Sequence, residues 1–144
     1  MNANIPQEAN KLTNVFFYVA RYFLGVIFFI AGINGYFVIF NLEPFIATSP
    51  EAMALFEFQY LLIFEKTLEI ICGLLLLLNR FVPLALAILS PIIINIFLLH
   101  LFLDHSLLLL AVILLTGHGY MLFYYRENFI KILEEKPLPH NIQK

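Results

Sequence analysis

The sequence predicts an all-α fold: an integral membrane protein built as an antiparallel four-helix bundle. Apolar residues make up 62% of the 144-residue chain and charged residues 12%, about half the charged share of a soluble domain. Four segments contain the roughly 20 mainly apolar residues that a membrane-spanning helix needs. Short polar breaks separate the last three segments, and such short turns make consecutive helices antiparallel neighbours.

The same composition excludes several classes of protein. So little charge cannot cover the surface of a soluble protein of this size, which excludes a soluble enzyme and a disordered chain. The net charge of −2 supplies no basic surface, so we expect no nucleic-acid partner. The single cysteine, Cys72, excludes an internal disulfide, a CxxC redox motif and a cysteine-based zinc site.

The first expected span covers residues 15–40 and follows a cytoplasmic tail over residues 1–14. The connection over residues 41–59 carries three glutamates and neither Lys nor Arg. A Ser-Pro-Glu sequence that begins at residue 49 is typical of a helix start, because it supplies a cap, a first-turn proline and a first-turn acid. We therefore expect a short helix within this connection.

The other spans are expected over residues 60–78, 81–103 and 106–125, followed by a partly helical cytoplasmic tail over residues 127–144. Pro83 follows the first polar break and suits the first turn of the third span. Small residues also predict close helix contacts. They are Gly25, Gly32 and Gly35 in the first span and Gly73 in the second.

Positive charge predicts the direction of the four-span domain, residues 15–126, in the membrane. If the spans alternate, seven of the eight basic residues fall on one side. They are Lys11, Arg21, Arg80, Arg126, Lys131, Lys136 and Lys144. Lys and Arg concentrate on the cytoplasmic side of membrane proteins. Both termini are therefore expected to face the cytoplasm.

Charged residues inside the hydrocarbon are costly, which makes them candidates for function. At about 1.5 Å per residue, Arg21, Glu69 and His118 lie about 9 to 15 Å from the cytoplasmic side and form an inner layer. Glu69 is placed to pair with Arg21, and His118 to bond either residue. Two alternatives stay open. Arg21 extends to the cytoplasmic surface as an anchor, or the pair only fixes the bundle.

A second layer of polar residues lies nearer the outside. Glu65 is one helical turn from Glu69 on the same face, and Asn95 on the third span is at a similar depth. Asn34 and His100 lie higher, near the outer surface. The asparagines have an alternative role, which is to bond helices together. The alternative for His100 is an interface residue that makes a local hydrogen bond.

The sequence predicts no metal site, no haem and no covalently bound cofactor. His100 and His118 differ by about 16 Å in depth, too far apart to ligate one haem. The spacing of His100, Asp104 and His105 is only a weak metal signal.

Several motifs resemble those of the DoxX family of small four-helix membrane proteins. In chain order they are Arg21 to Gly25 with Ala31-Gly32, Glu69 to Leu77, Asn79 to Ala85, Pro91 to Asn95 and His100 to Asp104. The resemblance spans about residues 15–133. The chain departs from the family at Cys72, where a glycine is frequent, and at Asn34-Gly35, where a lysine is frequent. Any role of that lysine therefore does not transfer.

The resemblance implies a membrane subunit of a redox system in a bacterial inner membrane, one that holds a quinone or a similar lipid-soluble molecule. Glu69 or His118 would bind a quinone oxygen and pass on its proton, and Arg21 would keep the acid ionised. No redox centre is visible in the sequence, so the chain is at most one subunit of a quinone-linked oxidoreductase, with electrons supplied by a protein partner.

Two other functions stay open. The first is a non-catalytic accessory or chaperone protein for a partner complex, and the second a small-solute or proton transporter along Glu65 and Asn95. Because four short-looped helices bury little besides their own contacts, a protein partner or a homo-oligomer is expected besides the lipid bilayer.

Overall fold

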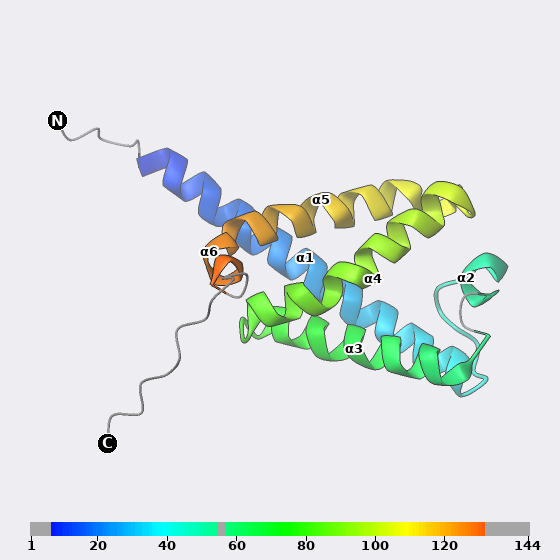
Figure 1. The fold of residues 1–144 in the computed structure, drawn as a ribbon. Helices are drawn as coiled ribbons and strands as arrows, with labels where there is room; N and C mark the ends of the chain where they lie inside the picture. Colours follow the sequence, from blue (N-terminus) through cyan, green and yellow to red (C-terminus); the bar gives the residue numbers. More distant parts are fainter. Residues whose placement is uncertain (1–6, 55–56, 132–144) are drawn as a thin grey trace, which may run out of the picture.

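The computed structural model describes residues 7–54 and 57–131, and within these residues the chain is helical, with no strand (Figure 1). The all-α prediction is confirmed for this part of the chain. The elements are α1 (Gln7–Ile39), α2 (Pro50–Ala54), α3 (Gln59–Leu77), α4 (Val82–Phe102), the 3-10 helix η1 (His105–Leu107), α5 (Leu108–Tyr124) and α6 (Arg126–Ile130).

Three segments among the described residues are long and apolar enough to cross a membrane. They are Thr13–Ile39, Val82–Phe102 and His105–Tyr124, and they match the first, third and fourth expected spans. The second expected span is also a helix, the 19-residue α3. It carries three charges, Glu65, Lys66 and Glu69, and does not meet the same criterion of composition.

The ends of the helices differ in one place from the expectation. α1 begins at Gln7, whereas the first span was expected to begin at residue 15, after a cytoplasmic tail over residues 1–14. The residues that precede the first apolar run are polar but include no Gly or Pro after residue 6, so nothing in them breaks a helix. The short helix α2 and the helical start of the C-terminal tail, α6, are both present. Residues 1–6 and 132–144 lie outside the described residues.

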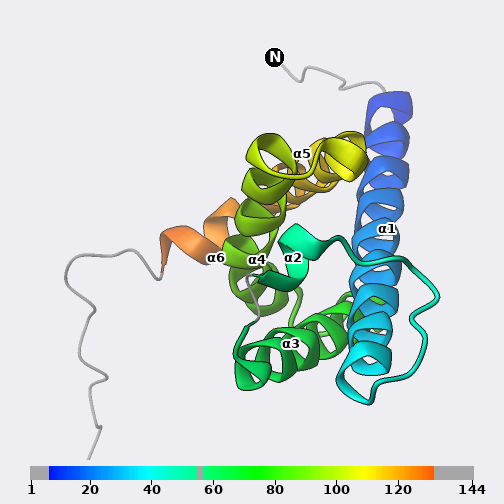
Figure 2. The same cartoon turned by 90° about the vertical axis from the view of Figure 1, so that its right-hand side faces the viewer.

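The four long helices pack as two pairs, α1 with α3 and α4 with α5, and the two members of each pair run in opposite directions (Figure 1). The pairs meet at the end that carries the start of α1 and α6, called the α6 end, and diverge toward the end that carries α2 and η1, called the α2 end. Figure 2 views the α2 end and shows α2 between the pairs. The buried apolar core lies where the pairs meet and includes Phe17, Leu24, Leu76, Leu86 and Met121.

Glycine allows the backbones of α1 and α3 to touch. A Cβ atom on Gly73 would lie 2.6 Å from the amide nitrogen of Phe29 and 2.9 Å from the carbonyl oxygen of Gly25. On Gly32 it would lie 2.9 Å from the carbonyl oxygen of Lys66. Real Cβ atoms do not approach backbone this closely, so the expected close contact between these helices is confirmed.

Asparagine closes the C-terminal ends of α1 and α3. Asn41 and Asn79 have φ angles of 57° and 55°, in the left-handed region that asparagine tolerates better than most residues. The next amide in the chain then donates back to the helix, from Leu42 to the carbonyl of Phe37 at 2.8 Å and from Arg80 to that of Leu75 at 2.9 Å. These bonds satisfy carbonyls that a helix end leaves open.

Candidate functional site

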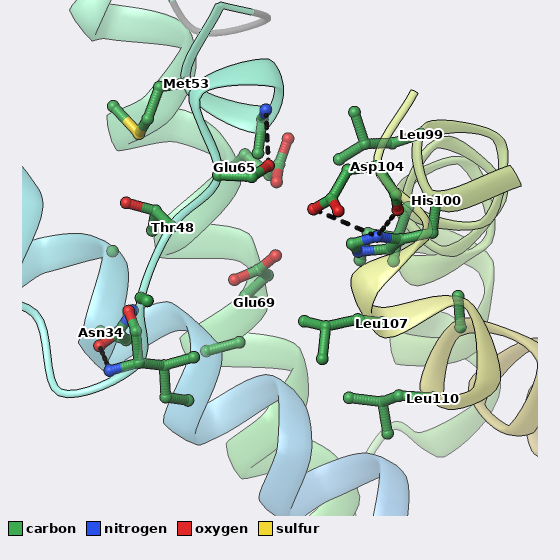
Figure 3. Close-up of a pocket in the computed structure, with 18 of the residues that line it drawn as sticks. Asn34, Thr48, Met53, Glu65, Glu69, Leu99, His100, Asp104, Leu107 and Leu110 are labelled. Carbon is green, nitrogen blue, oxygen red and sulfur yellow. Dashed lines mark hydrogen bonds and ion pairs between the residues drawn. The ribbon is translucent and has the colours of Figure 1, made fainter. Parts of the chain in front are cut away.

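A cavity of about 600 Å³ lies between the diverging helix pairs at the α2 end. Its wall combines the adjoining halves of α1, α3, α4 and α5 with residues 46–53, called the strap, which run from the α1–α3 connection into α2 (Figure 3). Most of the wall is apolar and includes Phe28, Leu62, Ile96, Leu99, Leu110 and Leu114. The polar side chains in it include Asn34, Glu65, Lys66, Glu69, Asn95, His100 and Asp104.

The structure brings together all four residues of the expected outer layer. Asn34, Glu65, Asn95 and His100 line the cavity from three different helices, and Glu69 joins them. In Figure 3, Glu65 and Glu69 on α3 face His100 and Asp104 on the opposite wall. The cavity is therefore polar on two facing sides and apolar between them.

The expected inner layer does not form one site. Of its three members, only Glu69 lines the cavity, and the Arg21–Glu69 ion pair is absent from the described residues. Glu69 pairs instead with Lys66, whose Nζ lies 2.9 and 3.0 Å from the two carboxylate oxygens. Lys66 stands three residues earlier on the same helix, the spacing at which side chains meet. A partner one turn away thus replaces the expected partner on another helix.

One ammonium bridges two carboxylates on α3. Besides Glu69, Lys66 Nζ contacts Glu65 Oε1 at 3.2 Å. The side chain of Glu69 is 1% exposed and that of Lys66 16%, so this charge cluster lies almost entirely within protein. The aliphatic part of Lys66 lies against Gly35, where a larger residue would displace it. Lys66 was not among the expected site residues, although its i,i+3 spacing to Glu69 was a signal for the pair.

Arg21 bonds to the end of α3 rather than to a side chain. Its Nη1 atom donates to the carbonyl oxygens of Leu76 and Leu77, and its guanidinium lies 4.4 Å from the ring centre of Tyr22. The last carbonyls of a helix lack partners within the helix and carry partial negative charge. The carbonyls of Leu76 and Leu77 lie closer to Arg21 along the length of the bundle than Glu69 does, because Glu69 lies two turns earlier on α3.

His118 joins α5 to α4 inside the core. Its Nε2 atom lies 2.9 Å from the hydroxyl of Ser90, which itself donates to the carbonyl of Leu86. Because that hydroxyl hydrogen is already used, His118 donates through Nε2. His118 is buried and does not line the cavity. Its expected role as a ligand-binding residue therefore has no support in the geometry.

A hydrogen bond fixes the ring of His100 at the mouth of the cavity. Its Nδ1 atom lies 2.7 Å from the backbone carbonyl oxygen of Asp104. The carboxylate of Asp104 accepts from the amide of Ser106 at 3.0 Å and caps η1. This bond from Ser106 is the main reason that the pKa of the Asp104 carboxyl lies below its usual value, which favours an ionised carboxylate at the mouth.

Asn34 ties the strap to α1. Its side-chain nitrogen donates to the carbonyl of Ile46 at 3.0 Å, and its side-chain oxygen accepts from the amide of Ile46 at 2.9 Å. The amide of a buried asparagine thus pairs with a single residue of the backbone, as one strand pairs with another. Asn34 is therefore a structural residue, but it bonds α1 to the strap and not to another helix, which its expected alternative role required.

Replacing Asn34 with alanine is expected to release the strap while the helices stay folded. Removing this amide takes away the acceptor of the Ile46 amide, and the net value of such a bond is about 1 kcal/mol. We expect the Ile46 amide to exchange its hydrogen about fivefold faster, measured by hydrogen–deuterium exchange. Asn128→Ala, at an exposed position of α6, is the matched control. Unchanged exchange at Ile46 would show that other contacts hold the strap.

Among the described residues, no three His, Cys, Asp or Glu side chains gather closely enough to hold a metal ion. Comparison of the chain with protein-family models, with curated proteins and with solved structures gave no match. The resemblance to the DoxX family therefore stays a prediction.

Proposed function

We propose that the chain is an integral membrane protein in which α1, α3, α4 and α5 form an antiparallel four-helix bundle, with both chain ends in the cytoplasm. The three apolar segments support this proposal. So do the large apolar side chains on the outside, among them Phe64, Phe102 and Leu109, which are 64%, 70% and 75% exposed. A soluble monomer rarely exposes so much apolar surface.

The charges of α3 are compatible with this placement. Glu69 and Lys66 face the cavity and each other rather than the outside of the bundle. Ionisable residues within membrane segments generally face the interior of a bundle and pair with one another. α3 is therefore proposed as the fourth span, although its composition alone does not identify it as one.

The proposed function is to hold a lipid-soluble molecule of the quinone class, as a DoxX-like membrane subunit of a redox system in a bacterial inner membrane. The cavity carries this proposal. Its volume of about 600 Å³ lies within the range of small-molecule sites, which are mostly apolar with a few converging polar groups. The apolar wall suits a hydrocarbon tail, and the polar groups of α3 and α4 suit an oxygen-bearing ring. Electron transfer is assigned to a partner protein.

Glu69→Gln is expected to lose the bound molecule while keeping the fold. The substitution keeps the size of the side chain but removes the charge that orders Lys66 within the cavity wall. The full chain would be purified in mild detergent, and its organic extract examined by absorption and mass spectrometry. We expect a stoichiometric quinone-type molecule in the wild type, and its loss in Glu69→Gln at an unchanged far-UV circular dichroism spectrum.

Glu127→Gln is the control for this experiment, because Glu127 is exposed on α6, away from the cavity. It is expected to retain the molecule. An extract that contains only bulk phospholipid in all three proteins would contradict the proposal and would favour the accessory role. If the wild type and both variants retain the molecule equally, the protein binds it without a contribution from the charge of Glu69.

A further inference from the structure

The charged groups in the cavity are unequally divided between hydrogen-bond donors and acceptors. The lining residues that the structure describes include four carboxylates, from Glu51, Glu65, Glu69 and Asp104, and one ammonium, from Lys66. An ionised carboxylate can only accept hydrogen bonds, and an ammonium can only donate them. The charged groups therefore present many acceptors and few donors to an occupant.

The hydrogens of Lys66 are directed at its own helix. Its Nζ atom lies within 3.2 Å of three carboxylate oxygens, two of Glu69 and one of Glu65. Lys66 is thus committed to the wall, whereas each carboxylate retains lone pairs beyond those that the ammonium uses.

The opposite wall also offers an acceptor. His100 Nδ1 lies 2.7 Å from a backbone carbonyl oxygen, and a carbonyl can only accept, so Nδ1 carries the hydrogen. In the neutral form of the ring, Nε2 is then an acceptor. Glu69 and His100 point toward one another across the cavity (Figure 3). Asn95 and the hydroxyl groups of Thr48, Ser49 and Ser106 each contribute both a donor and an acceptor. The charged groups therefore set the balance.

We infer that the cavity selects an occupant whose head group donates hydrogen bonds. For a ligand of the quinone class, this means the reduced dihydroxy form in preference to the oxidised dicarbonyl form, an inference that rests on the proposed function. The hydroxyl groups of the reduced form donate to the carboxylates of α3 and to His100. The carbonyl groups of the oxidised form would face these acceptors, and desolvated acceptors without a donor are destabilising.

A matched pair of ligands tests this inference. The probes are a decyl-substituted benzoquinone and its hydroquinone, which share ring and tail and differ in two hydroxyl hydrogens. Binding to the full chain in detergent would be measured by calorimetry without oxygen. We expect the hydroquinone to bind at least about tenfold more tightly. Bound to the protein, the quinone couple would then have a two-electron midpoint potential about 30 mV higher for each tenfold of preference.

A methylated ligand and Glu→Gln variants of the protein test whether hydrogen donation, rather than ligand shape, sets the preference. The dimethyl ether of the hydroquinone lacks both hydroxyl hydrogens, and we expect it to lose the advantage. Glu65→Gln replaces a carboxylate of the cavity wall, one turn from Glu69, with an amide that also donates. The preference of this variant should fall toward equal binding. Glu127→Gln, on the exposed face of α6, should keep the wild-type preference.

The outcomes distinguish the inference from the function on which it rests. Equal binding of the two forms by the wild type, or tighter binding of the quinone, would overturn the inference and leave the proposed function standing. Binding of the dimethyl ether as tight as that of the hydroquinone would also overturn it. Failure of every probe to bind would overturn the inference together with the proposed function.

Discussion

Gly73→Ala is expected to separate α1 from α3 and to destabilise the protein by about 3 kcal/mol, the upper end of the usual range for overpacking. The added methyl group would meet backbone atoms, the amide nitrogen of Phe29 at 2.6 Å and the carbonyl oxygen of Gly25 at 2.9 Å. A side chain in that position could rotate away, but the backbone of a helix moves only with the whole helix. The two helices must therefore part.

The measurement is the free energy of unfolding in mixed micelles, followed by circular dichroism as denaturing detergent is added. Gly119→Ala is the matched control, because a Cβ atom there has no neighbour within 4 Å. It is expected to be neutral or to stabilise by up to about 1 kcal/mol, since alanine favours helix over glycine. Similar losses for both variants would mean that the two helices do not touch at Gly73.

Lys66→Met is expected to destabilise the protein by about 3 to 5 kcal/mol, the range seen when one partner of a buried ion pair is removed. Methionine retains most of the aliphatic stem that lies against Gly35 but no charge. Glu69, with a side chain 1% exposed, would then hold a buried negative charge with no compensating cation one turn away. The cost arises from that carboxylate rather than from lost packing.

A double variant separates these two sources. Adding Glu69→Gln to Lys66→Met removes the uncompensated charge and should restore a large part of the stability, which is a coupling that a double-mutant cycle measures. Lys131→Met makes the same change at an exposed position beyond α6 and should alter the unfolding free energy little. If the double variant is less stable than Lys66→Met, the ion pair is not the reason for the loss.

Most of the fold could be predicted because it depends on the lengths of apolar segments and on the breaks between them. The break at Asn79 lies where the structure closes α3, since polar residues with left-handed φ angles end helices in a recognisable way. The start of α1 could not be predicted, because hydropathy locates a membrane boundary and not a helix boundary. The polar residues before Thr13 continue the helix without continuing the apolar run.

The site could be predicted only in part, for a geometric reason. Counting residues along each helix gives depth, and depth grouped Glu65 with Asn95, which the cavity brings together. Depth does not give the direction in which a side chain points around its helix. Arg21 and Glu69 were grouped by depth, yet each has a different partner, a helix end in one case and Lys66 in the other.

The divergence of the two helix pairs gives the cavity a mechanical property. The pairs are held together by the core at the α6 end, and the cavity lies at the other end of the same helices. A helix as long as α4 measures about 30 Å, so a rotation of about 5° at the core moves its far end by roughly 3 Å. We therefore expect the α4–α5 pair to rotate about core residues such as Leu86 and Met121. A change in the size of these side chains would then alter the width of the cavity, although neither residue lines it.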